Sequence, residues 1–140
     1  LMKPEEIEKR SFAIITEELG ELSMPPEQAA VVKRVIHTTA DFDYAESLVF
    51  SNNALAAGFD ALHNGTAIIT DTTMALAGIN KAALARRNCT AHCYIGDADV
   101  AETAKANGWT RSRAAMDKAV QFHGDAIYLI GHAPPALMPL

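Results

Sequence analysis

Cysteine is scarce in this sequence, and its placement argues against a metal site. The chain contains two cysteines, Cys89 and Cys93, which enclose His92 in the segment CTAHC. Zinc sites usually draw four ligands from two spaced pairs of Cys or His, and no second pair of that kind is present. Two thiols in an alternating apolar run are more typical of core packing. We therefore predict no metal ligands, and the cysteine content is compatible with a reducing compartment.

A surplus of basic residues and a long apolar run are also missing. The sequence has 12 Lys and Arg against 17 Asp and Glu, for a formal net charge of −5. The basic residues are dispersed, which argues against partners such as nucleic acids or anionic membranes. No apolar run approaches the length of a membrane span, and the first residues, LMKPEEIEKR, carry acidic groups where a secretion signal is basic and then apolar. We expect a cytoplasmic protein.

The common nucleotide and hydrolase motifs are absent as well. The sequence contains no GxGxxG, no GxxxxGK[ST] and no GxSxG. Dinucleotide-binding, P-loop and α/β-hydrolase proteins therefore lack their motifs here. There is no internal repeat, low-complexity tract or linker, and 140 residues are the size of one domain. We predict a single domain over residues 1–140.

What the sequence does contain is an alternation of helical and short apolar segments. Apolar runs that predict buried strands occur at residues 48–50, 67–69, 90–95 and 126–130. Segments with helical spacing precede, separate and follow these runs, at residues 7–22, 26–44, 55–62, 76–84, 100–107, 110–120 and after 135. This alternation predicts an α/β fold with a doubly wound, mainly parallel sheet and helices on both of its faces.

The segment richest in chemically active side chains is 31–44, VVKRVIHTTADFDY. Pro26 suits the first turn of a helix, and apolar residues recur at helical spacing after it, so one face of this helix is buried. The charge of Arg34 disfavours a protonated His37, and the charge of Asp41 favours it. Whichever charge has the larger influence, we expect the ring to titrate near neutrality. The segment is therefore either an ordinary amphipathic helix with a histidine near its C-terminal end, or part of a site.

Two further groups of polar residues lie at the starts of predicted helices. Asp71 and Thr73 follow a strand, at the carboxyl edge where open α/β sheets bind ligands, so they are either helix caps or ligand contacts. Arg111 and Arg113 fall in the first turn of a helix that Thr110 caps. Cations are disfavoured at this end of a helix unless an anion binds there. The pair therefore indicates either an anion-binding corner or surface arginines paired with carboxylates.

Five segments carry a resemblance to one protein family. They are KRSFAIITEE, RVIHTTADFDY, ITDTTMALAGINKAAL, GWTRSRAAM and IGHAPPAL, in this order along nearly the whole chain. In these segments the chain resembles the precorrin-8X methylmutases, also called precorrin isomerases, of corrin biosynthesis. The resemblance implies an isomerase of cobalamin biosynthesis that moves a methyl group from C-11 to C-12 of precorrin-8X or cobalt-precorrin-8. The product would be hydrogenobyrinic or cobyrinic acid, and no methyl donor or cofactor is implied.

The same resemblance implies roles for individual residues. His37 would be the catalytic general acid, whose proton redistributes the conjugation of the macrocycle so that the methyl can migrate. Ser11 is by its sequence alone a tolerated residue in mid-helix, but the resemblance implies that it contacts the substrate. Arg111 would pair with the substrate or with the carboxylates of the substrate. The remaining expected substrate contacts are Arg34, Thr38 and Ser112. The family also implies a homodimer.

The sequence departs from the family pattern at three places. Ala40 replaces the glycine of HTTGD, which removes a flexible position just after the histidine. His132 and Pro135 stand in a motif that the family usually reads as GNAPTAL. The family's chain continues past this motif with a further strand and helix, so we expect the C-terminal part of the family domain to be absent from residues 1–140.

Two other functions remain open at this point. One is a non-catalytic corrinoid-binding or carrier protein, which would take up a corrinoid without converting it. The other is a hydrolase or transferase built around the two arginines of the predicted anion corner. That function needs a nucleophile, for which Ser11 and Ser112 are the candidates.

Overall fold

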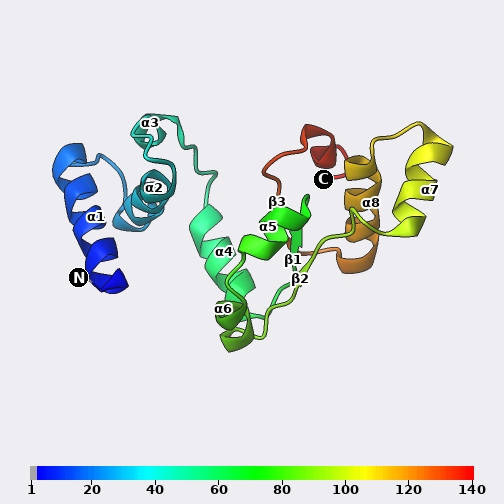
Figure 1. Cartoon of the computed structure of the whole chain (residues 1–140), viewed down its shortest axis with the longest axis horizontal. Helices are drawn as coiled ribbons and strands as arrows, with labels where there is room; N and C mark the ends of the chain where they lie inside the picture. The colour runs from blue at the N-terminus through cyan, green and yellow to red at the C-terminus, as the bar shows by residue number, and fades with distance from the viewer. Residues whose placement is uncertain (1–2) are drawn as a thin grey trace. The chain divides into compact units, whose positions relative to one another are not determined.

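The computed structural model describes residues 3–140, and the chain divides between Ala56 and Ala57 into two compact units. Figure 1 follows the elements from the blue N-terminus to the red C-terminus. We call the part up to Ala56 the first unit and the part from Ala57 the second unit. The expectation of a single domain over the whole chain stays a prediction.

The first unit consists of helices. They are α1 (Pro4–Leu19), α2 (Pro26–Thr39) and the short α3 (Tyr44–Ser47). Pro26 occupies the first turn of α2, as the sequence predicts, because the N–H that proline lacks would have no helical partner there. A core of Ile15 from α1 with Val32 and Ile36 from α2 holds the helices together.

One predicted strand of the first unit is wrong. Residues 48–50 form no strand, although the alternation expected of extended chain is visible in their burial. Leu48 and Phe50 pack against the core of Ile15, Val32 and Ile36, while Val49 is 88% exposed. The segment finds helices rather than another strand beside it, and backbone groups of a strand need a neighbouring strand to pair with.

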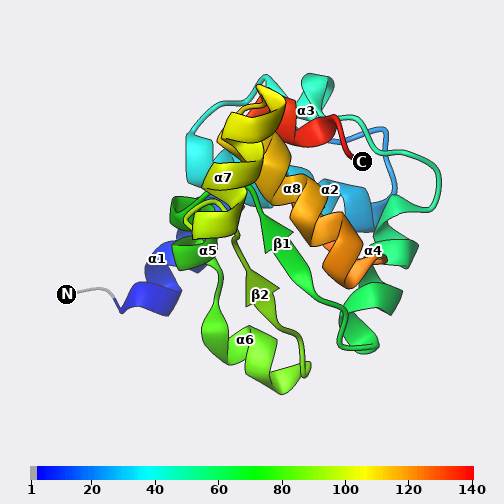
Figure 2. The same cartoon turned by 90° about the vertical axis from the view of Figure 1, so that its right-hand side faces the viewer.

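The second unit contains the sheet. Its strands are β1 (Ile68–Thr70), β2 (Ala91–His92) and β3 (Ile127–Leu129), which correspond to three of the predicted runs. They are parallel and lie in the order β2-β1-β3, with Ile68 paired with both Ala91 and Ile127. The chain therefore winds from the central strand first to one side and then to the other, as a doubly wound sheet does. Figure 2 shows β1 and β2 side by side.

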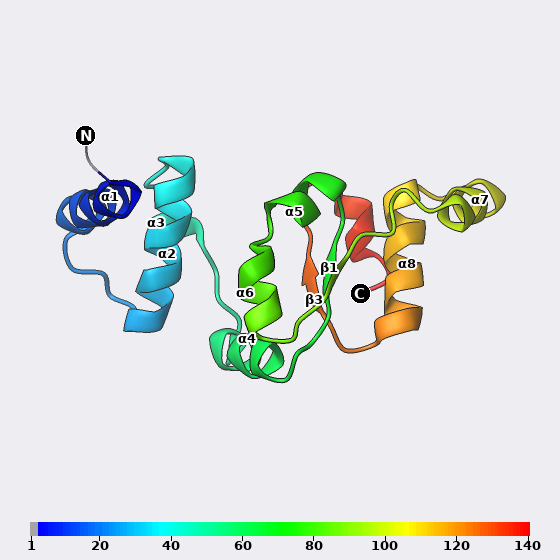
Figure 3. The ribbon, with the colours of Figure 1, turned by 60° about the horizontal axis from the view of Figure 1, so that its bottom comes forward.

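Helices cover both faces of this sheet (Figure 3). The helical elements of the second unit are α4 (Ala54–His63, which begins just before the division), α5 (Thr73–Gly78), α6 (Lys81–Arg86), α7 (Ala98–Asn107), α8 (Arg111–His123) and the 3₁₀ helix η1 (Pro134–Leu137). On one face Ile69 packs against Met116 and Ala119 of α8. On the other face Ile68 lines a cavity together with residues of α4 and α6. The predicted fold class is confirmed.

Local capping residues explain where the helices of the second unit begin and end. The expected helix over residues 76–84 is two helices, because Asn80 caps α6 by accepting a hydrogen bond from the N–H of Ala83. The predicted cap Thr110 is confirmed, since its Oγ1 accepts from the N–H of Arg113. Gly65 lies in the turn after α4 with φ +70°, and a Cβ there would lie 3.0 Å from the carbonyl oxygen of Asn88. Only glycine fits this position without a shift of the backbone.

Candidate active site

The two side chains at the centre of the predicted site are in direct contact. Ser11 lies in the middle of α1, and His37 lies two residues before the end of α2. Ser11 Oγ and His37 Nδ1 are hydrogen-bonded at 2.8 Å. Ser11 precedes the core residue Ile15 by one helical turn and His37 follows the core residue Ile36, so the packing of the two helices brings the pair together. The other ring nitrogen, Nε2, has no hydrogen-bond partner among residues 3–140.

The imidazole of His37 is also held on its face. The ring of Phe12 stacks on it with centroids 5.0 Å apart and an angle of 16° between the planes. The guanidinium of Arg34 lies over the Phe12 ring, 4.6 Å from its centroid. Arg34 in turn pairs with Glu8, with 2.6 Å between Nη1 and Oε1. The hydrogen bond and the charge of Arg34 lower the pKa of Glu8, so this carboxylate stays ionised near neutral pH.

His37 borders an open groove of about 500 Å³ in the first unit. The walls are mainly apolar, with isoleucines from α1 and α2 and the ring of Phe42. Ser11, Arg10 and Glu18 are the polar residues of α1 that line it. The imidazole is half-buried, so it lies at the wall of a ligand-sized groove and not in a dry interior.

The end of α2 shows how Ala40 takes the place of the family's glycine. Ala40 adopts the left-handed conformation, with φ 56° and ψ 24°, and its N–H donates to the carbonyl of Ile36 at 2.8 Å. A residue with a Cβ is strained in this conformation, whereas glycine is not. Thr38 is exposed, and its hydroxyl donates to the carbonyl of Arg34 at 3.1 Å. Ala40 therefore adopts the left-handed conformation at the end of α2 at the cost of some strain.

Arg111 and Ser112, the other predicted contacts, belong to the second unit at the start of α8. Arg111 is exposed and forms no ion pair with any residue in the range 3–140. Arg113 is used differently, because its guanidinium lies over the ring of Trp109, 4.1 Å from the centroid. Of the two arginines expected at the anion corner, one is thus engaged by an aromatic ring. The role of Arg111 in anion binding stays a prediction.

Asp71 is not a helix cap, contrary to one of its two expected roles. The cap of α5 is the neighbouring Thr72, whose Oγ1 accepts from the N–H of Ala75. The Oδ2 of Asp71 instead accepts three backbone hydrogen bonds of 2.8 to 3.1 Å, from the N–H groups of residues 131–133. Asp71 is 3% exposed, and its Oδ1 has no partner among the described residues. Burial raises the pKa of this carboxyl, but the three hydrogen bonds outweigh burial, and the net pKa is lowered.

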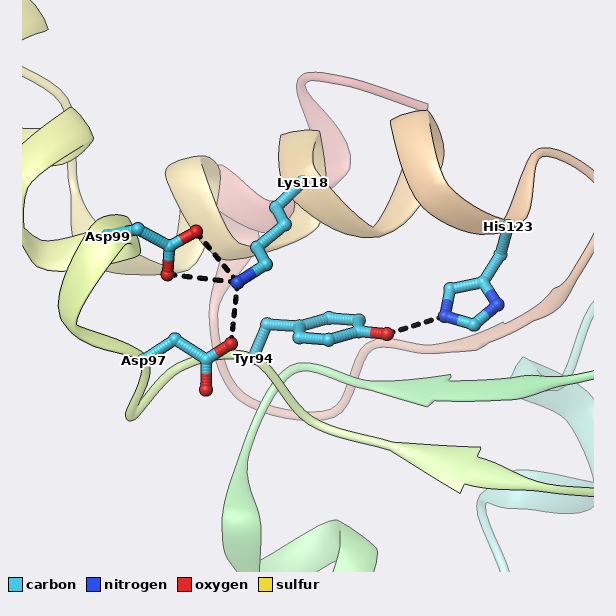
Figure 4. Close-up of polar contacts among 5 residues, drawn as sticks. All are labelled: Tyr94, Asp97, Asp99, Lys118 and His123. Atoms are coloured by element: carbon cyan, nitrogen blue, oxygen red, sulfur yellow. Dashed lines mark hydrogen bonds and ion pairs between the residues drawn. The ribbon is translucent and has the colours of Figure 1, made fainter.

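The structure also contains a group of titratable side chains that the sequence does not single out (Figure 4). The hydroxyl of Tyr94 lies 2.6 Å from Nε2 of His123, on which the ring of His92 also packs. Burial and the nearby His92 lower the pKa of His123, which favours the neutral ring. Lys118 lies on the same helix and pairs with two carboxylates, those of Asp97 and Asp99, at 2.7 and 2.8 Å.

The sequence predicts core packing for the two cysteines, and this is seen for Cys89. Cys89 is buried, Cys93 is half-buried, and both are free thiols. Within residues 3–140 no group of three or more His, Cys, Asp or Glu side chains is arranged to hold a metal ion. None of the helices in this range is long and apolar enough to cross a membrane.

A doubly wound sheet, and a half-buried histidine that faces a ligand-sized groove, define an α/β protein with a candidate acid–base site. Comparison with protein families gives the more particular result. The chain belongs to the precorrin-8X methylmutase family, whose family model matches residues 6–140. The resemblance seen in the five sequence segments is therefore confirmed.

Individual relatives agree with this assignment. The chain is 43% identical over 146 residues to the cobalt-precorrin-8 methylmutase of Salmonella typhimurium, a match that covers 100% of the chain and 70% of that protein. It is 39% identical to the cobalt-precorrin-8 methylmutase of Priestia megaterium, over 99% of the chain and 62% of the relative. A solved structure of the precorrin-8X methylmutase from Thermus thermophilus superimposes with a TM-score of 0.86 at 35% identity, over 95% of this chain and 65% of that one. The chain thus spans about two thirds of the length of the relatives it matches.

Proposed function

We propose that this protein is an isomerase that moves a methyl group from C-11 to C-12 of precorrin-8X or cobalt-precorrin-8, with His37 as the general acid. Membership of the methylmutase family supports the reaction class. The observation that carries the role of His37 is its placement, with Nδ1 bonded to Ser11 and Nε2 uncommitted beside a groove of about 500 Å³. Histidine exchanges protons near neutral pH, which suits a step that needs a proton given and taken back.

The Ser11 hydroxyl can serve both protonation states of the imidazole. When the ring is protonated, its Nδ1–H donates to Ser11 Oγ, and Nε2–H is left to face a ligand. After the proton has passed to the macrocycle, the hydroxyl can rotate and donate to Nδ1 instead. The ring thus keeps one orientation through the transfer. The proton redistributes the conjugation, the bond from the methyl to C-11 breaks as the bond to C-12 forms, and the proton returns to His37.

The remaining predicted residues are proposed as substrate contacts. The substrate carries many carboxylates, and Arg111 is exposed with no ion pair in residues 3–140, so its guanidinium is available to bind such a group. Ser112 and Thr38 complete the set, whereas Arg34, which the sequence also suggests as a contact, is already paired with Glu8. The homodimer implied by the family resemblance and the cytoplasmic location expected from the sequence are part of the same proposal.

Replacement of His37 tests the function. The variant His37→Ala should convert precorrin-8X or cobalt-precorrin-8 about 10² to 10⁴ times more slowly than the unchanged protein, because the proton donor is missing. The absorption change of the macrocycle follows the conversion. His63→Ala, which removes an exposed histidine of α4, should keep the normal rate and serves as the control.

Three outcomes of this experiment are informative. A normal rate in His37→Ala would remove the proposed acid. A protein that takes up the coloured corrinoid in stoichiometric amount, yet never converts it, would establish the carrier function in place of the isomerase. Activity that survives the loss of His37 but disappears in Ser11→Ala or Ser112→Ala would support a nucleophilic mechanism instead.

A further inference from the structure

His37 is contacted by two side chains that restrict different motions of its ring. The bond from Ser11 to Nδ1 fixes one corner of the imidazole, but it leaves the ring free to tilt about that bond. The Phe12 ring, which is nearly parallel to the imidazole at a centroid distance of 5.0 Å, opposes this tilt. Only the two contacts together fix the direction in which Nε2 points.

Phe12 also contacts a cation. Arg34 lies over the Phe12 ring, 4.6 Å from its centre, so the ring contacts both His37 and Arg34, and we call these contacts of Phe12 the stack. Glu8 fixes the guanidinium through the 2.6 Å ion pair. The Arg34 and Glu8 side chains are 60% and 48% exposed, respectively, so water screens this pair and the charge contributes less than the geometry.

The stack gives Arg34 a different use from the one expected from the sequence. Its guanidinium already has a carboxylate partner in Glu8 and an aromatic surface in Phe12. A substrate carboxylate would have to displace Glu8 to bind it. A guanidinium over an aromatic ring is well suited to hold that ring in place, since it can contact the ring and keep its hydrogen bonds to a carboxylate.

We propose that Phe12 is a positioning residue for the imidazole of His37, and that Arg34 acts on the reaction through Phe12 and not by binding the substrate. This inference rests on the proposed role of His37 as the acid. It assigns two residues of the first unit to one task, which is to aim Nε2 at the macrocycle while Ser11 holds Nδ1.

The stack can be measured without any enzymatic activity. The ring current of Phe12 shifts the NMR signals of the His37 ring protons upfield. In Phe12→Leu these signals should move downfield, and in Phe12→Tyr, which keeps the aromatic ring, they should stay close to their original positions. Unchanged signals in Phe12→Leu would show that the rings do not stack in solution and would overturn the proposal. The far-ultraviolet circular dichroism and the melting temperature check that each variant is folded.

Kinetics separate positioning from substrate binding. A misaligned acid slows the chemical step, so Phe12→Leu should lower kcat about 10-fold to 100-fold with KM nearly unchanged, and Phe12→Tyr should restore most of the rate. Arg34→Met should lower kcat by a smaller factor, about 3-fold, because the ring remains but is less firmly held. If Arg34→Met instead raises KM about 10-fold and leaves kcat intact, Arg34 binds substrate and its proposed role is wrong.

Two controls sharpen this comparison. Lys33→Met removes a positive charge from the residue next to Arg34, without removing a stacking partner of Phe12, and should change neither kcat nor the His37 signals. The double variant Phe12→Leu with Arg34→Met should be as slow as Phe12→Leu alone, since Arg34 acts only through the ring. Additive losses would contradict this chain of contacts. His37→Ala separately tests the acid, so failure of the positioning role is distinguishable from failure of the proposed function.

Discussion

The two units of this protein use similar side chains in opposite ways. In the first unit the imidazole of His37 keeps Nε2 free of partners within the described chain, beside an open groove. In the second unit Nε2 of His123 is bonded to Tyr94, and one oxygen of Asp71 carries three hydrogen bonds. The comparison teaches that a reactive side chain is recognised by the atom that the fold leaves uncommitted. The type of residue and its burial are weaker guides.

The units also differ in the distance along the chain that their contacts span. The first unit is held by two successive helices, with a polar pair 26 residues apart. In the second unit Asp71 reaches residues 60 to 62 positions further on. The contact between Ser11 and His37 thus joins neighbouring helices, whereas the second unit is completed by contacts between residues far apart in the sequence.

The largest effect is expected from replacement of Asp71, whose hydrogen bonds join distant parts of the second unit. Asp71→Ala leaves three N–H groups without their acceptor, and hydrogen bonds to a charged group are strong, so the second unit should lose about 3 kcal/mol or more of stability. Denaturant unfolding measures the loss. The isosteric Asp71→Asn, which keeps an oxygen acceptor without the charge, should lose less. Amide exchange should accelerate in the second unit while the Ser11 and His37 signals persist; simultaneous loss of both would contradict the contrast between the units.

The second largest effect concerns the free nitrogen of the first unit. Ser11→Ala removes the partner of Nδ1 and allows the ring of His37 to turn, so kcat should fall about 10-fold to 100-fold, which corresponds to about 1.4 to 2.7 kcal/mol. Steady-state kinetics with the corrin precursor measures the change. Ser51→Ala, an exposed serine of the same unit, should have the normal rate. Equal rates in both variants would mean that this hydrogen bond does not orient the acid.

A smaller effect is expected from the strained end of α2. Ala40→Gly relieves the left-handed conformation, and the first unit should gain up to about 1 kcal/mol, which thermal unfolding measures. Asn88 in the second unit has a similar φ of 53°, but asparagine tolerates this conformation better than alanine. Asn88→Gly should therefore gain less. If both variants gain equal stability, alanine is no more strained than asparagine in the left-handed conformation.

The smallest effect is a pH dependence of the second unit. Burial and then the neighbouring His92 hold the pKa of His123 below its ordinary value of 6.5. The unfolded chain therefore binds this proton more readily, and the contribution of the neutral, Tyr94-bonded ring is complete above about pH 6.5 and declines as the pH falls below it. The decline should be visible in denaturant unfolding between pH 7 and 5. The pKa of Lys118 is raised by its carboxylate partners and that of Asp99 is lowered by Lys118, so both stay charged over this range.

Replacement of His123 isolates this contribution. His123→Gln lacks the titrating ring, so its stability should change less with pH over the same range, while His63→Ala should retain the full decline. An identical pH profile for His123→Gln and the unchanged protein would assign the decline to other groups, such as His92.

Much of the fold follows from signals that act over a few residues. Pro26 marks the start of α2 and Thr110 caps α8, both as the sequence predicts, and Gly108 ends α7 in the left-handed conformation. The order of helices and apolar runs also predicts the parallel sheet. The run at 48–50 was misleading because its apolar side chains pack on helices, and an apolar alternation does not specify which partner covers it.

The candidate site, too, could be predicted from the sequence only in part. The sequence and the family resemblance single out His37 and Ser11, and the structure brings them into contact. Neither signals the stack of Phe12, because it depends on how two helices pack face to face. The bond between Tyr94 and His123 spans 29 positions and has no sequence motif. The acceptor role of Asp71 could have been suspected only from its place at the end of the central strand, where turns from neighbouring strands converge.

The link from Asp71 to residues 131–133 has a consequence for synthesis of the protein. A chain leaves the ribosome from its N-terminus, so both helices that carry Ser11 and His37 emerge before the sheet has been translated. The carboxylate of Asp71 remains hydrated until about 60 more residues have been added, because the N–H groups of residues 131–133 have not yet been synthesised. The Ser11 and His37 pair can therefore assemble early during translation, while the sheet closes only after Ala133 has left the exit tunnel.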